Sequence, residues 1–285
     1  MPPRSRSTPS ARCDVSVSAG TQAAVAACVA RFGRLDVLVN NAGVIDLRAS
    51  SEVDTALGEF RALLAVNLLG AQRLACEAAD VMRGRSGGVV INLASAGGFV
   101  ASPLRPGYDA SKAAIMAMTG ALSGEWTPFG VRVNAVAPGY ILTEMLEGLV
   151  ASGKVNQSAV AARIPLGRLG RPSEIAEVIH FIASDASASI SGTTVIADGG
   201  FLAVGGARAP STGPAPTRGA RHGPRSVVVT GATSELGRQI ATFHIARGDR
   251  VILYDDDAEG LESARRAIGG ECLAAFGRRD RRGRA

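Results

Sequence analysis

Tyr108 and Lys112 are the side chains of this sequence best suited to acid–base chemistry. They stand four positions apart in Tyr-Asp-Ala-Ser-Lys, so a helix would place them on one face, one turn apart. A phenol titrates at about pH 10, too high for efficient proton exchange at neutral pH, but a nearby ammonium favours the phenolate and lowers its pKa. The pair therefore predicts a tyrosine general acid and base assisted by a lysine.

Two other polar residues could act with this pair. Ser95 directly follows an apolar run, 88–94, so its hydroxyl would reach the crevice at the carboxyl end of a parallel sheet, where ligands bind. There it could hydrogen-bond a substrate oxygen whose charge changes during the reaction. Asn67 lies in a predicted helix, where an asparagine usually points to water. Neither residue indicates catalysis by itself.

A glycine-rich turn, Thr230-Gly-Ala-Thr-Ser-Glu-Leu-Gly237, comes much later in the chain. It follows the apolar run 226–230 and opens a helical pattern, so it predicts a site where a helix N-terminus receives a pyrophosphate. Asp255 stands eighteen residues after Gly237, at the end of the next apolar run. A carboxylate there would accept hydrogen bonds from an adenosine 2′-hydroxyl and repel a 2′-phosphate, so NAD is favoured over NADP.

The elements that must position these residues alternate between strand and helix patterns. We expect buried strands at 35–41, 88–94, 131–136 and 193–197, and helices at 19–32, 57–83, 110–125 and 173–184. This alternation is typical of an α/β fold with a doubly wound parallel sheet. Residues 203–225 are rich in glycine and proline and predict a linker, after which 226–276 form a second strand–helix–strand block. We expect disordered tails at 1–12 and 277–285.

Together these residues resemble the short-chain dehydrogenase/reductase family, from about residue 13 to 201. Asn67, Ser95, Tyr108 and Lys112 match the family's catalytic tetrad in order, with thirteen residues from the serine to the tyrosine. Further matches are its strand-end motif Asn40-Asn-Ala-Gly43, the loop Pro138-Gly139 with Thr143, the last strand's Asp198-Gly-Gly200, and the adenine-contacting pair Asp14-Val15. The stretch 13–202 is therefore identified as the catalytic portion.

The resemblance implies a Rossmann-type fold and hydride transfer between nicotinamide C4 and a carbinol or carbonyl carbon. Tyr108 would be the general acid and base, and Ser95 would steady the substrate oxygen. Lys112 would lower the tyrosine pKa and hold the nicotinamide ribose, while Asn67 would anchor a water in the proton relay. The implied cofactor contacts are Gly231, Thr233, Ser234, Leu236, Gly237, Asp255, Asp14, Val15, Asn40, Ala42, Gly43, Tyr108, Lys112, Pro138, Gly139, Ile141 and Thr143.

The order of the two parts departs from the family pattern. The family begins with the strand, glycine turn and second strand that here occupy 226–276, so the first βαβ cofactor-binding unit is displaced to the C-terminus. Glu235 also stands where the family has the middle glycine of the turn, which adds bulk and negative charge beside the phosphates. We expect this glutamate to weaken cofactor binding unless its side chain turns outward.

Two arrangements explain this order. In the first, the chain is a piece of a tandem protein and holds most of one dehydrogenase and the opening of the next, with arginine-rich ends that look like out-of-frame translation. In the second, the block 226–276 completes the first domain as a circular permutation, in the same chain or in another copy. The third strand of that block could come from 272–276 or from 10–13.

Composition limits the remaining function classes. The net charge of +6 comes entirely from 1–13, 203–225 and 276–285, outside the periodic elements, and the rest of the chain is net negative, so we do not expect nucleic-acid binding. The four cysteines and three histidines are scattered, which argues against a metal site and for a reducing, cytoplasmic location. No apolar run is long enough to span a membrane. The N-terminus does not look like a secretory signal, although a transit peptide stays open.

The sequence therefore predicts an NAD-dependent oxidoreductase acting on a secondary alcohol or ketone. By resemblance its substrate is a 3-oxoacyl or a polyol or sugar-like compound, and the protein is a homodimer or homotetramer. The alternative is an inactive, truncated or misframed fragment that acts at most as an oligomerisation partner. A cofactor-sensing regulator is a third reading, supported only by the glycine turn.

Overall fold

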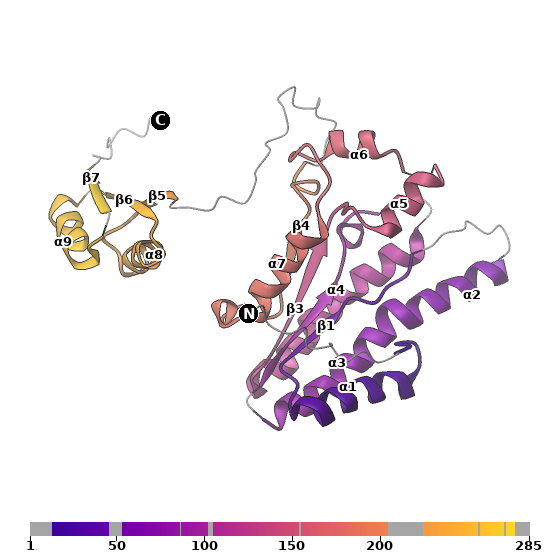
Figure 1. Cartoon of the computed structure of the whole chain (residues 1–285). Helices are drawn as coiled ribbons and strands as arrows, with labels where there is room; N and C mark the ends of the chain where they lie inside the picture. The colour runs from indigo at the N-terminus through magenta and orange to yellow at the C-terminus, as the bar shows by residue number, and fades with distance from the viewer. Residues whose placement is uncertain are drawn as a thin grey trace, which may run out of the picture. The chain divides into compact units, whose positions relative to one another are not determined.

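The structure is a computed structural model that describes residues 13–45, 53–85, 87–101, 105–153, 155–204, 225–255, 257–270 and 272–276. It divides into two compact units, Met1–Pro216 and Thr217–Ala285, and each is described here by itself (Figure 1). The expected tails 1–12 and 277–285, and residues 205–224 of the expected linker, lie outside the described residues.

The N-terminal unit is built on a four-stranded parallel sheet in the order β1-β2-β3-β4. The strands are β1 (Val37–Asn40), β2 (Gly88–Leu93), β3 (Val131–Pro138) and β4 (Thr194–Ala197). All four predicted strands are present. Burial is confirmed for β2 and β3, as their continuous apolar runs indicate, but it is wrong for β1 and β4, whose residues are mostly half-buried or exposed.

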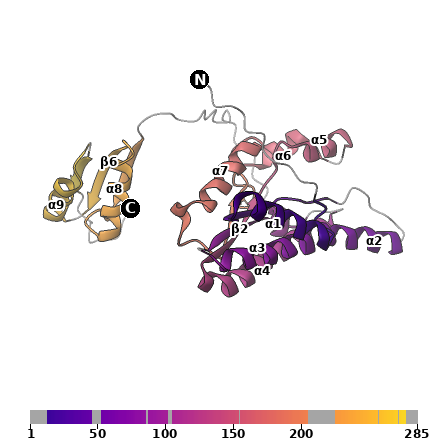
Figure 2. The same ribbon diagram turned by 60° about the horizontal axis from the view of Figure 1, so that its bottom comes forward.

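Helices cover both faces of this sheet: α1 (Ser18–Phe32), α3 (Ala71–Arg83) and α4 (Pro106–Trp126) on one side and α7 (Pro172–Ala183) on the other (Figures 1 and 2). Val90 and Trp126 belong to the core on the α3 and α4 side. Ile91 packs with Ile175 and Ile182 of α7 on the opposite side. This two-sided arrangement confirms the expected α/β fold.

The predicted helix 57–83 is interrupted. It consists of α2 (Val53–Leu64), a π-helical turn η1 (Ala65–Gly70) and α3. A Cβ at Gly70 would lie 2.7 Å from the carbonyl oxygen of Val15, so the absence of a side chain lets the segment before α1 lie directly on η1. The short elements are η2 (Ala96–Gly98), η3 (Thr127–Phe129), α5 (Glu144–Ala151), α6 (Gln157–Arg163) and η4 (Asp185–Ser187).

The C-terminal unit contains a three-stranded parallel sheet in the order β5-β6-β7. Its elements are β5 (Ser226–Thr230), α8 (Glu235–Ile245), β6 (Arg250–Asp255), α9 (Ala258–Ile268) and β7 (Cys272–Phe276). Of the two candidates for the third strand, Cys272–Phe276 is paired with β6, whereas residues 10–12 of the other candidate lie outside the described residues. Both helices pack on one face of the sheet, around Val229, Val251 and Leu253.

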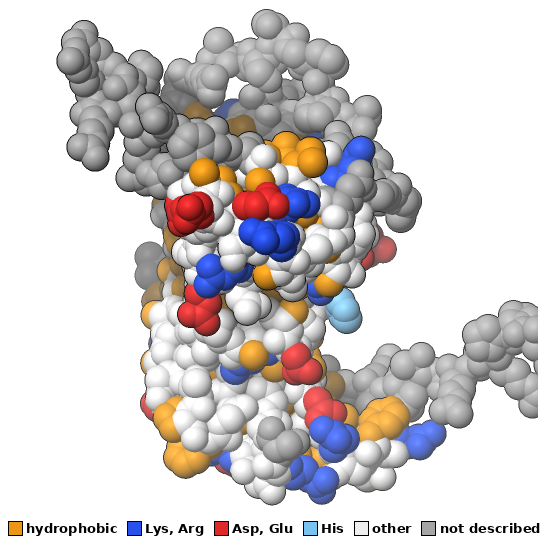
Figure 3. All heavy atoms as spheres, turned by 90° about the vertical axis from the view of Figure 1, so that its left-hand side faces the viewer, with side chains coloured by type: hydrophobic (Ala, Val, Ile, Leu, Met, Phe, Trp, Pro, Cys, Tyr) orange, Lys and Arg blue, Asp and Glu red, His pale blue; other side chains and the backbone are white. Residues whose placement is uncertain are grey.

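The hydropathy of the helices and the distribution of surface charge bear on membrane and nucleic-acid binding. Among the described residues no helix is long and apolar enough to cross a membrane. On the face drawn in Figure 3, the coloured Lys and Arg side chains are interspersed with Asp and Glu and do not merge into one basic surface.

Candidate active site

The turn after β2 places Ser95 against helix α4. The Ser95 Oγ accepts a hydrogen bond from the Gly97 N–H at 3.1 Å, which caps η2. A Cβ at Gly97 would collide with the Asp109 carboxylate, and one at Gly98 would lie 2.9 Å from the backbone carbon of Lys112. Glycine at both positions therefore lets the turn rest on α4 and holds the Ser95 hydroxyl beside the first turns of that helix.

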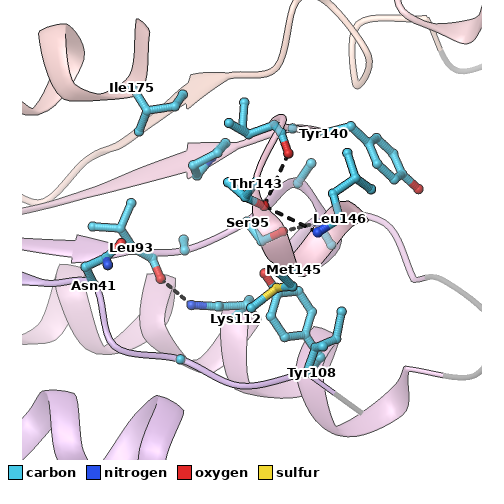
Figure 4. A pocket seen from close by; sticks show the side chains of 18 of the residues that line it. Asn41, Leu93, Ser95, Tyr108, Lys112, Tyr140, Thr143, Met145, Leu146 and Ile175 are labelled. Atoms are coloured by element: carbon cyan, nitrogen blue, oxygen red, sulfur yellow. Dashed lines mark hydrogen bonds between the residues drawn. The ribbon is translucent and has the colours of Figure 1, made fainter. Parts of the chain in front are cut away.

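Tyr108 and Lys112 lie on the same face of α4, as their spacing predicted (Figure 4). Lys112 is 5% exposed, and its Nζ donates a hydrogen bond of 2.6 Å to the Leu93 carbonyl at the end of β2. The ammonium lies 5.6 Å from the centre of the Tyr108 ring. The helix therefore anchors its lysine to the strand that ends next to Ser95.

Burial decides the ionisation of this pair. It raises the pKa of Tyr108 above its ordinary value of 10.0, and the hydrogen bond with Ser95 acts in the opposite direction. Burial also lowers the pKa of Lys112 to about 8. Desolvation of the phenolate outweighs the hydrogen bond with Ser95, so the net direction is upward. That Lys112 lowers the tyrosine pKa stays a prediction. Tyr108 is held as a protonated donor at neutral pH.

Asn67 faces the same region from η1. Its side chain is 2% exposed, accepts from the Val44 N–H at 2.8 Å, and donates to the Val44 carbonyl at 2.9 Å and to the Ser111 Oγ at 3.0 Å. A Cβ at Gly43 would lie 3.4 Å from the Asn67 Oδ1 and 3.6 Å from the Lys112 Nζ. The loop after β1 therefore passes between Asn67 and Lys112. Of the four residues of the predicted tetrad, Ser95, Tyr108 and Lys112 line the pocket described below and Asn67 is not among its lining residues.

Asn40, expected to contact the cofactor, uses its side chain inside the sheet. It is 7% exposed and donates to the Ala71 carbonyl at 3.0 Å and to the Asn92 Oδ1 at 2.9 Å, and Asn92 in turn donates to the Thr119 Oγ1. This network joins β1, β2, α3 and α4. Its neighbour Asn41 lines the pocket instead.

The loop after β3 forms the wall opposite Tyr108. A Cβ at Gly139 would lie 2.8 Å from the Cα of Asp198, so glycine allows this loop to touch the turn after β4. The loop is also fastened to Gly170, whose N–H donates to the Tyr140 carbonyl and whose own carbonyl accepts from the Leu142 N–H. Thr143 caps α5 by accepting from the Leu146 N–H.

These elements enclose a pocket of about 600 Å³ (Figure 4). Of the residues expected at the site, the following line it: Ala42, Gly43, Ser95, Tyr108, Lys112, Pro138, Gly139, Ile141 and Thr143. The site prediction left out Arg105, Tyr140, Ile175, Ile179 and Phe201, which also line it. Arg105 could have been predicted, because it is a charged residue directly before the helix that carries Tyr108. No local sequence pattern marks the isoleucines of α7.

Asp14 and Val15 are not among the residues that line this pocket. The Asp14 Oδ1 accepts hydrogen bonds from the N–H and Oγ of Ser16, which lowers the pKa of its carboxyl. Val15 packs against Gly70. In this structure both residues shape the start of α1.

The glycine turn of the C-terminal unit has a backbone suited to a dinucleotide. Gly231 has φ +64°, and a Cβ at Gly237 would collide with the Gly231 carbonyl, so the tight turn needs both glycines. The Asp255 Oδ2 accepts from the N–H and Oγ1 of Thr233 at 3.0 and 2.8 Å. The carboxylate therefore lies beside the turn, where the adenosine end of a dinucleotide fits.

Three other residues of this turn bear on its fit to a dinucleotide. The Ser234 Oγ already accepts from the Gly237 N–H and caps α8, and Leu236 is 70% exposed. Glu235 is exposed in the first turn of α8, where its charge is favourable to the helix dipole and competes with a phosphate. The residues present fit an adenosine diphosphate group apart from this glutamate.

Comparisons with known proteins agree with this geometry. The sequence model of the family described as enoyl-(acyl carrier protein) reductase matches residues 4–202. An uncharacterized short-chain type dehydrogenase/reductase of Sinorhizobium fredii is 39% identical over 236 residues, which cover 80% of this chain and 42% of that protein. The chain therefore spans less than half the length of this relative.

Two further relatives carry described activities. A D-threitol dehydrogenase of Mycolicibacterium smegmatis is 39% identical over 66% of this chain and 71% of its own length. The solved gluconate 5-dehydrogenase of Burkholderia cenocepacia, in complex with NADP and tartrate, is 35% identical, with a TM-score of 0.61 over 67% of this chain and 74% of its own. With Ser95, Tyr108 and Lys112 lining one pocket and these matches, the chain belongs to the short-chain dehydrogenase/reductase family.

Proposed function

We propose that the protein is an oxidoreductase that transfers a hydride between NAD(H) and a secondary alcohol or ketone. The observation that carries the proposal is the pocket of about 600 Å³ in which Ser95, Tyr108 and Lys112 meet the loop after β3. The threitol and gluconate dehydrogenases among its relatives support a polyol or sugar-like substrate, and a 3-oxoacyl substrate is the other class that the resemblance predicted.

Tyr108 and Ser95 act on the substrate oxygen. Because burial keeps the Tyr108 hydroxyl protonated, it donates its proton to the carbonyl oxygen in the direction of reduction and recovers one in the direction of oxidation. The Ser95 hydroxyl steadies the same oxygen by a hydrogen bond. The nicotinamide supplies or accepts the hydride at its C4 when the cofactor is bound.

Lys112 and Asn67 act through the cofactor ribose, Tyr108 and the loop after β1. Lys112 would bind the nicotinamide ribose, and its ammonium, 5.6 Å from the centre of the Tyr108 ring, would favour the phenolate as the proton leaves. Asn67 fixes the loop after β1 through its two hydrogen bonds with Val44 and anchors the proton relay. In the C-terminal unit, Gly231, Gly237 and Asp255 would hold the adenosine diphosphate part of a dinucleotide, as the resemblance predicted.

The preference for NAD rests on Asp255. Its carboxylate, held beside the turn by Thr233, would accept from a ribose 2′-hydroxyl and repel a 2′-phosphate. The Burkholderia cenocepacia relative contains NADP, so the choice must be measured on this chain. Titration with NADH and NADPH decides it: tighter binding of NADPH by the unaltered chain would refute the assignment.

The test of the catalytic assignment is Tyr108→Phe. We expect it to abolish turnover and to leave NADH binding intact, measured by energy transfer from Trp126. Tyr140→Phe is the matched control, because Tyr140 lines the same pocket and packs edge-on against Phe201 at 5.5 Å. Equal turnover by Tyr108→Phe and the unaltered protein would remove the proposed role.

A second candidate function has its own support. The Sinorhizobium fredii match covers 80% of this chain, more than the N-terminal unit Met1–Pro216 contains, so it continues into the C-terminal unit in the same order. This favours a piece of a tandem protein without dehydrogenase activity. Glu235→Gly separates the two candidates. Removing a charge about 5 Å from a phosphate recovers roughly 1–3 kcal/mol, so an active protein should bind NADH about ten- to a hundredfold more tightly.

A further inference from the structure

Arg105 is a charged side chain of the pocket that the proposed chemistry does not use. It lines the pocket together with Ser95 and Tyr108 and is half-buried. Its backbone is held at the start of α4, because Pro106 is the first residue of the helix and the Arg105 carbonyl accepts from the Asp109 N–H at 3.0 Å. The Arg105 side chain therefore reaches the pocket about one helical turn before Tyr108.

The Arg105 guanidinium lies close enough to Tyr108 to act on its ionisation. Burial has the largest effect on the Tyr108 hydroxyl and raises its pKa, whereas the positive charge of Arg105 acts in the opposite direction. Such an effect indicates proximity, since salt screens exposed charges that are more than about 10 Å apart. An anion bound to Arg105 would therefore lie within the length of a small substrate from the reacting oxygen.

The Arg105 side chain makes no ion pair with any carboxylate that the structure describes. Other arginines of the chain are paired, such as Arg168 with Glu174 and Arg225 with Asp249, each at 2.7 Å. A guanidinium always carries its charge, and a charge that faces a largely apolar cavity favours an anionic partner. Arg105 therefore has the chemistry of a binding residue for an anion.

The other charged side chains that line the described part of the pocket are Asp109 and Lys112. The Lys112 ammonium donates to the Leu93 carbonyl at 2.6 Å and would hold the nicotinamide ribose. The Asp109 side chain is 8% exposed, and its carboxylate lies against Gly97 in the turn after β2. Much of the remaining wall is apolar and includes Ile45, Val100, Met145, Leu146, Ile179 and Phe201. Among these described residues, Arg105 is therefore the cation that a substrate can use.

We propose that Arg105 binds a carboxylate of the substrate, so that the protein acts on a hydroxy acid and the corresponding oxo acid. This inference rests on the proposed function and narrows it. Arg105 holds the carboxylate while Ser95 and Tyr108 receive the hydroxyl or carbonyl oxygen of the reacting carbon. The carboxylate itself is unchanged by the hydride transfer. A neutral polyol and a 3-oxoacyl thioester carry no carboxylate, so Arg105 favours acids over both classes.

A single guanidinium suits a carboxylate better than a phosphate. Its planar fork donates two parallel hydrogen bonds to the two oxygens of a carboxylate, whose one charge it balances. A phosphate monoester carries about −1.5 to −2 charges at pH 7. Among the described lining residues, its second charge would find only Lys112, which already donates to the Leu93 carbonyl, and would also face the Asp109 carboxylate.

Two pairs of matched compounds test the role of Arg105. Xylonate and xylitol share one carbon skeleton and differ in the carboxylate, as do 3-hydroxybutanoate and butane-1,3-diol. With NAD present, we expect the full-length chain to bind at least one acid about ten- to a hundredfold more tightly than the matching alcohol, because hydrogen bonds to a charged group contribute on this scale. Calorimetry measures binding, and the absorbance of NADH measures turnover.

Three variants assign the preference to the guanidinium. Arg105→Gln removes the charge, so binding of the acid should fall to that of the alcohol, with the loss in KM rather than in kcat. Arg105→Lys keeps the charge without the planar fork and should retain only part of the preference. The matched control is Arg163→Gln, because the Arg163 guanidinium lies 5.2 Å from the ring centre of the pocket residue Phe201 but is not among the lining residues. It should leave the preference unchanged.

The outcomes separate this inference from the proposed function. Binding and turnover of an acid that Arg105→Gln weakens and Arg163→Gln does not support both. The same binding without turnover of any compound supports the carboxylate site and refutes hydride transfer. Turnover of the alcohols with no preference for the acids, or a preference that survives Arg105→Gln, overturns the inference and leaves the proposed function standing. Failure of both acids to bind also overturns it, and tighter binding of xylitol phosphate than of xylonate overturns it in favour of a phosphate.

Discussion

Replacing Lys112 by methionine should make the protein more stable while abolishing its proposed activity. Lys112 is 5% exposed, and burial lowers its pKa from 10.5 to about 8. Each pKa unit corresponds to about 1.4 kcal/mol, so the buried ammonium costs the native state about 3 kcal/mol at pH 7. Methionine has a similar length and no charge, but it leaves the Leu93 carbonyl without its donor, which costs about 1 kcal/mol. We expect a net gain of about 2 kcal/mol.

The pH dependence of the unfolding free energy tests the direction of this effect. The folded pKa of Lys112 is depressed, so between pH 8 and 10.5 the unfolded chain holds the proton more often than the native state does. The stability of the unaltered protein should therefore rise through this window as the cost of the charge is relieved. In Lys112→Met this rise should be missing, and the two proteins should approach each other above pH 10.5.

Urea unfolding followed by the fluorescence of Trp126 measures the effect. Trp126 is the only tryptophan and lies at the end of the helix that carries Lys112, so it reports on the N-terminal unit. A gain of about 2 kcal/mol moves the midpoint up by roughly 1 M urea at an m-value of about 2 kcal/mol/M. Arg61→Met, at an exposed position of α2, controls for the loss of one positive charge. If Lys112→Met is no more stable than the unaltered protein at pH 7, the burial cost assigned to the lysine is wrong.

Three further changes test other parts of the structure. Gly98→Ala puts a methyl group 2.9 Å from the α4 backbone, so it should cost about 1–3 kcal/mol of unfolding free energy and reduce kcat/KM at least about tenfold, whereas Gly120→Ala, with open space around it, should do neither. Asp249→Asn should destabilise the C-terminal unit, because the Arg225 guanidinium holds the pKa of the Asp249 carboxyl well below 3.8. The stability that this carboxylate contributes is present above pH 3.8 and is lost on acidification. Limited proteolysis as a function of pH measures the loss. The pKa of the Glu174 carboxyl is lowered from 4.5 to about 2, so the stability that it contributes is present above pH 4.5 and is lost as the pH falls through about 2. Glu174→Gln should lack this contribution, and thermal unfolding at pH 7 and pH 2 compares the two proteins.

The sequence predicted the strands better than the helices around the pocket. Long apolar runs identify β2 and β3 because both faces of those strands are buried. The helices α5 and α6 are eight and seven residues long, too short for a clear periodicity. Their caps, Thr143 and Asn156, were the available signals, since each accepts a hydrogen bond from the backbone of its helix.

The candidate site shows the same limit at the level of single residues. Spacing predicted that Tyr108 and Lys112 share one helix face, and the family resemblance added Ser95, which lines the same pocket. Spacing could not distinguish Asn40 from Asn41, since which of two adjacent side chains enters the sheet depends on the neighbouring strand. The pKa of Tyr108 depends on how deeply the ring is buried, which no local pattern records.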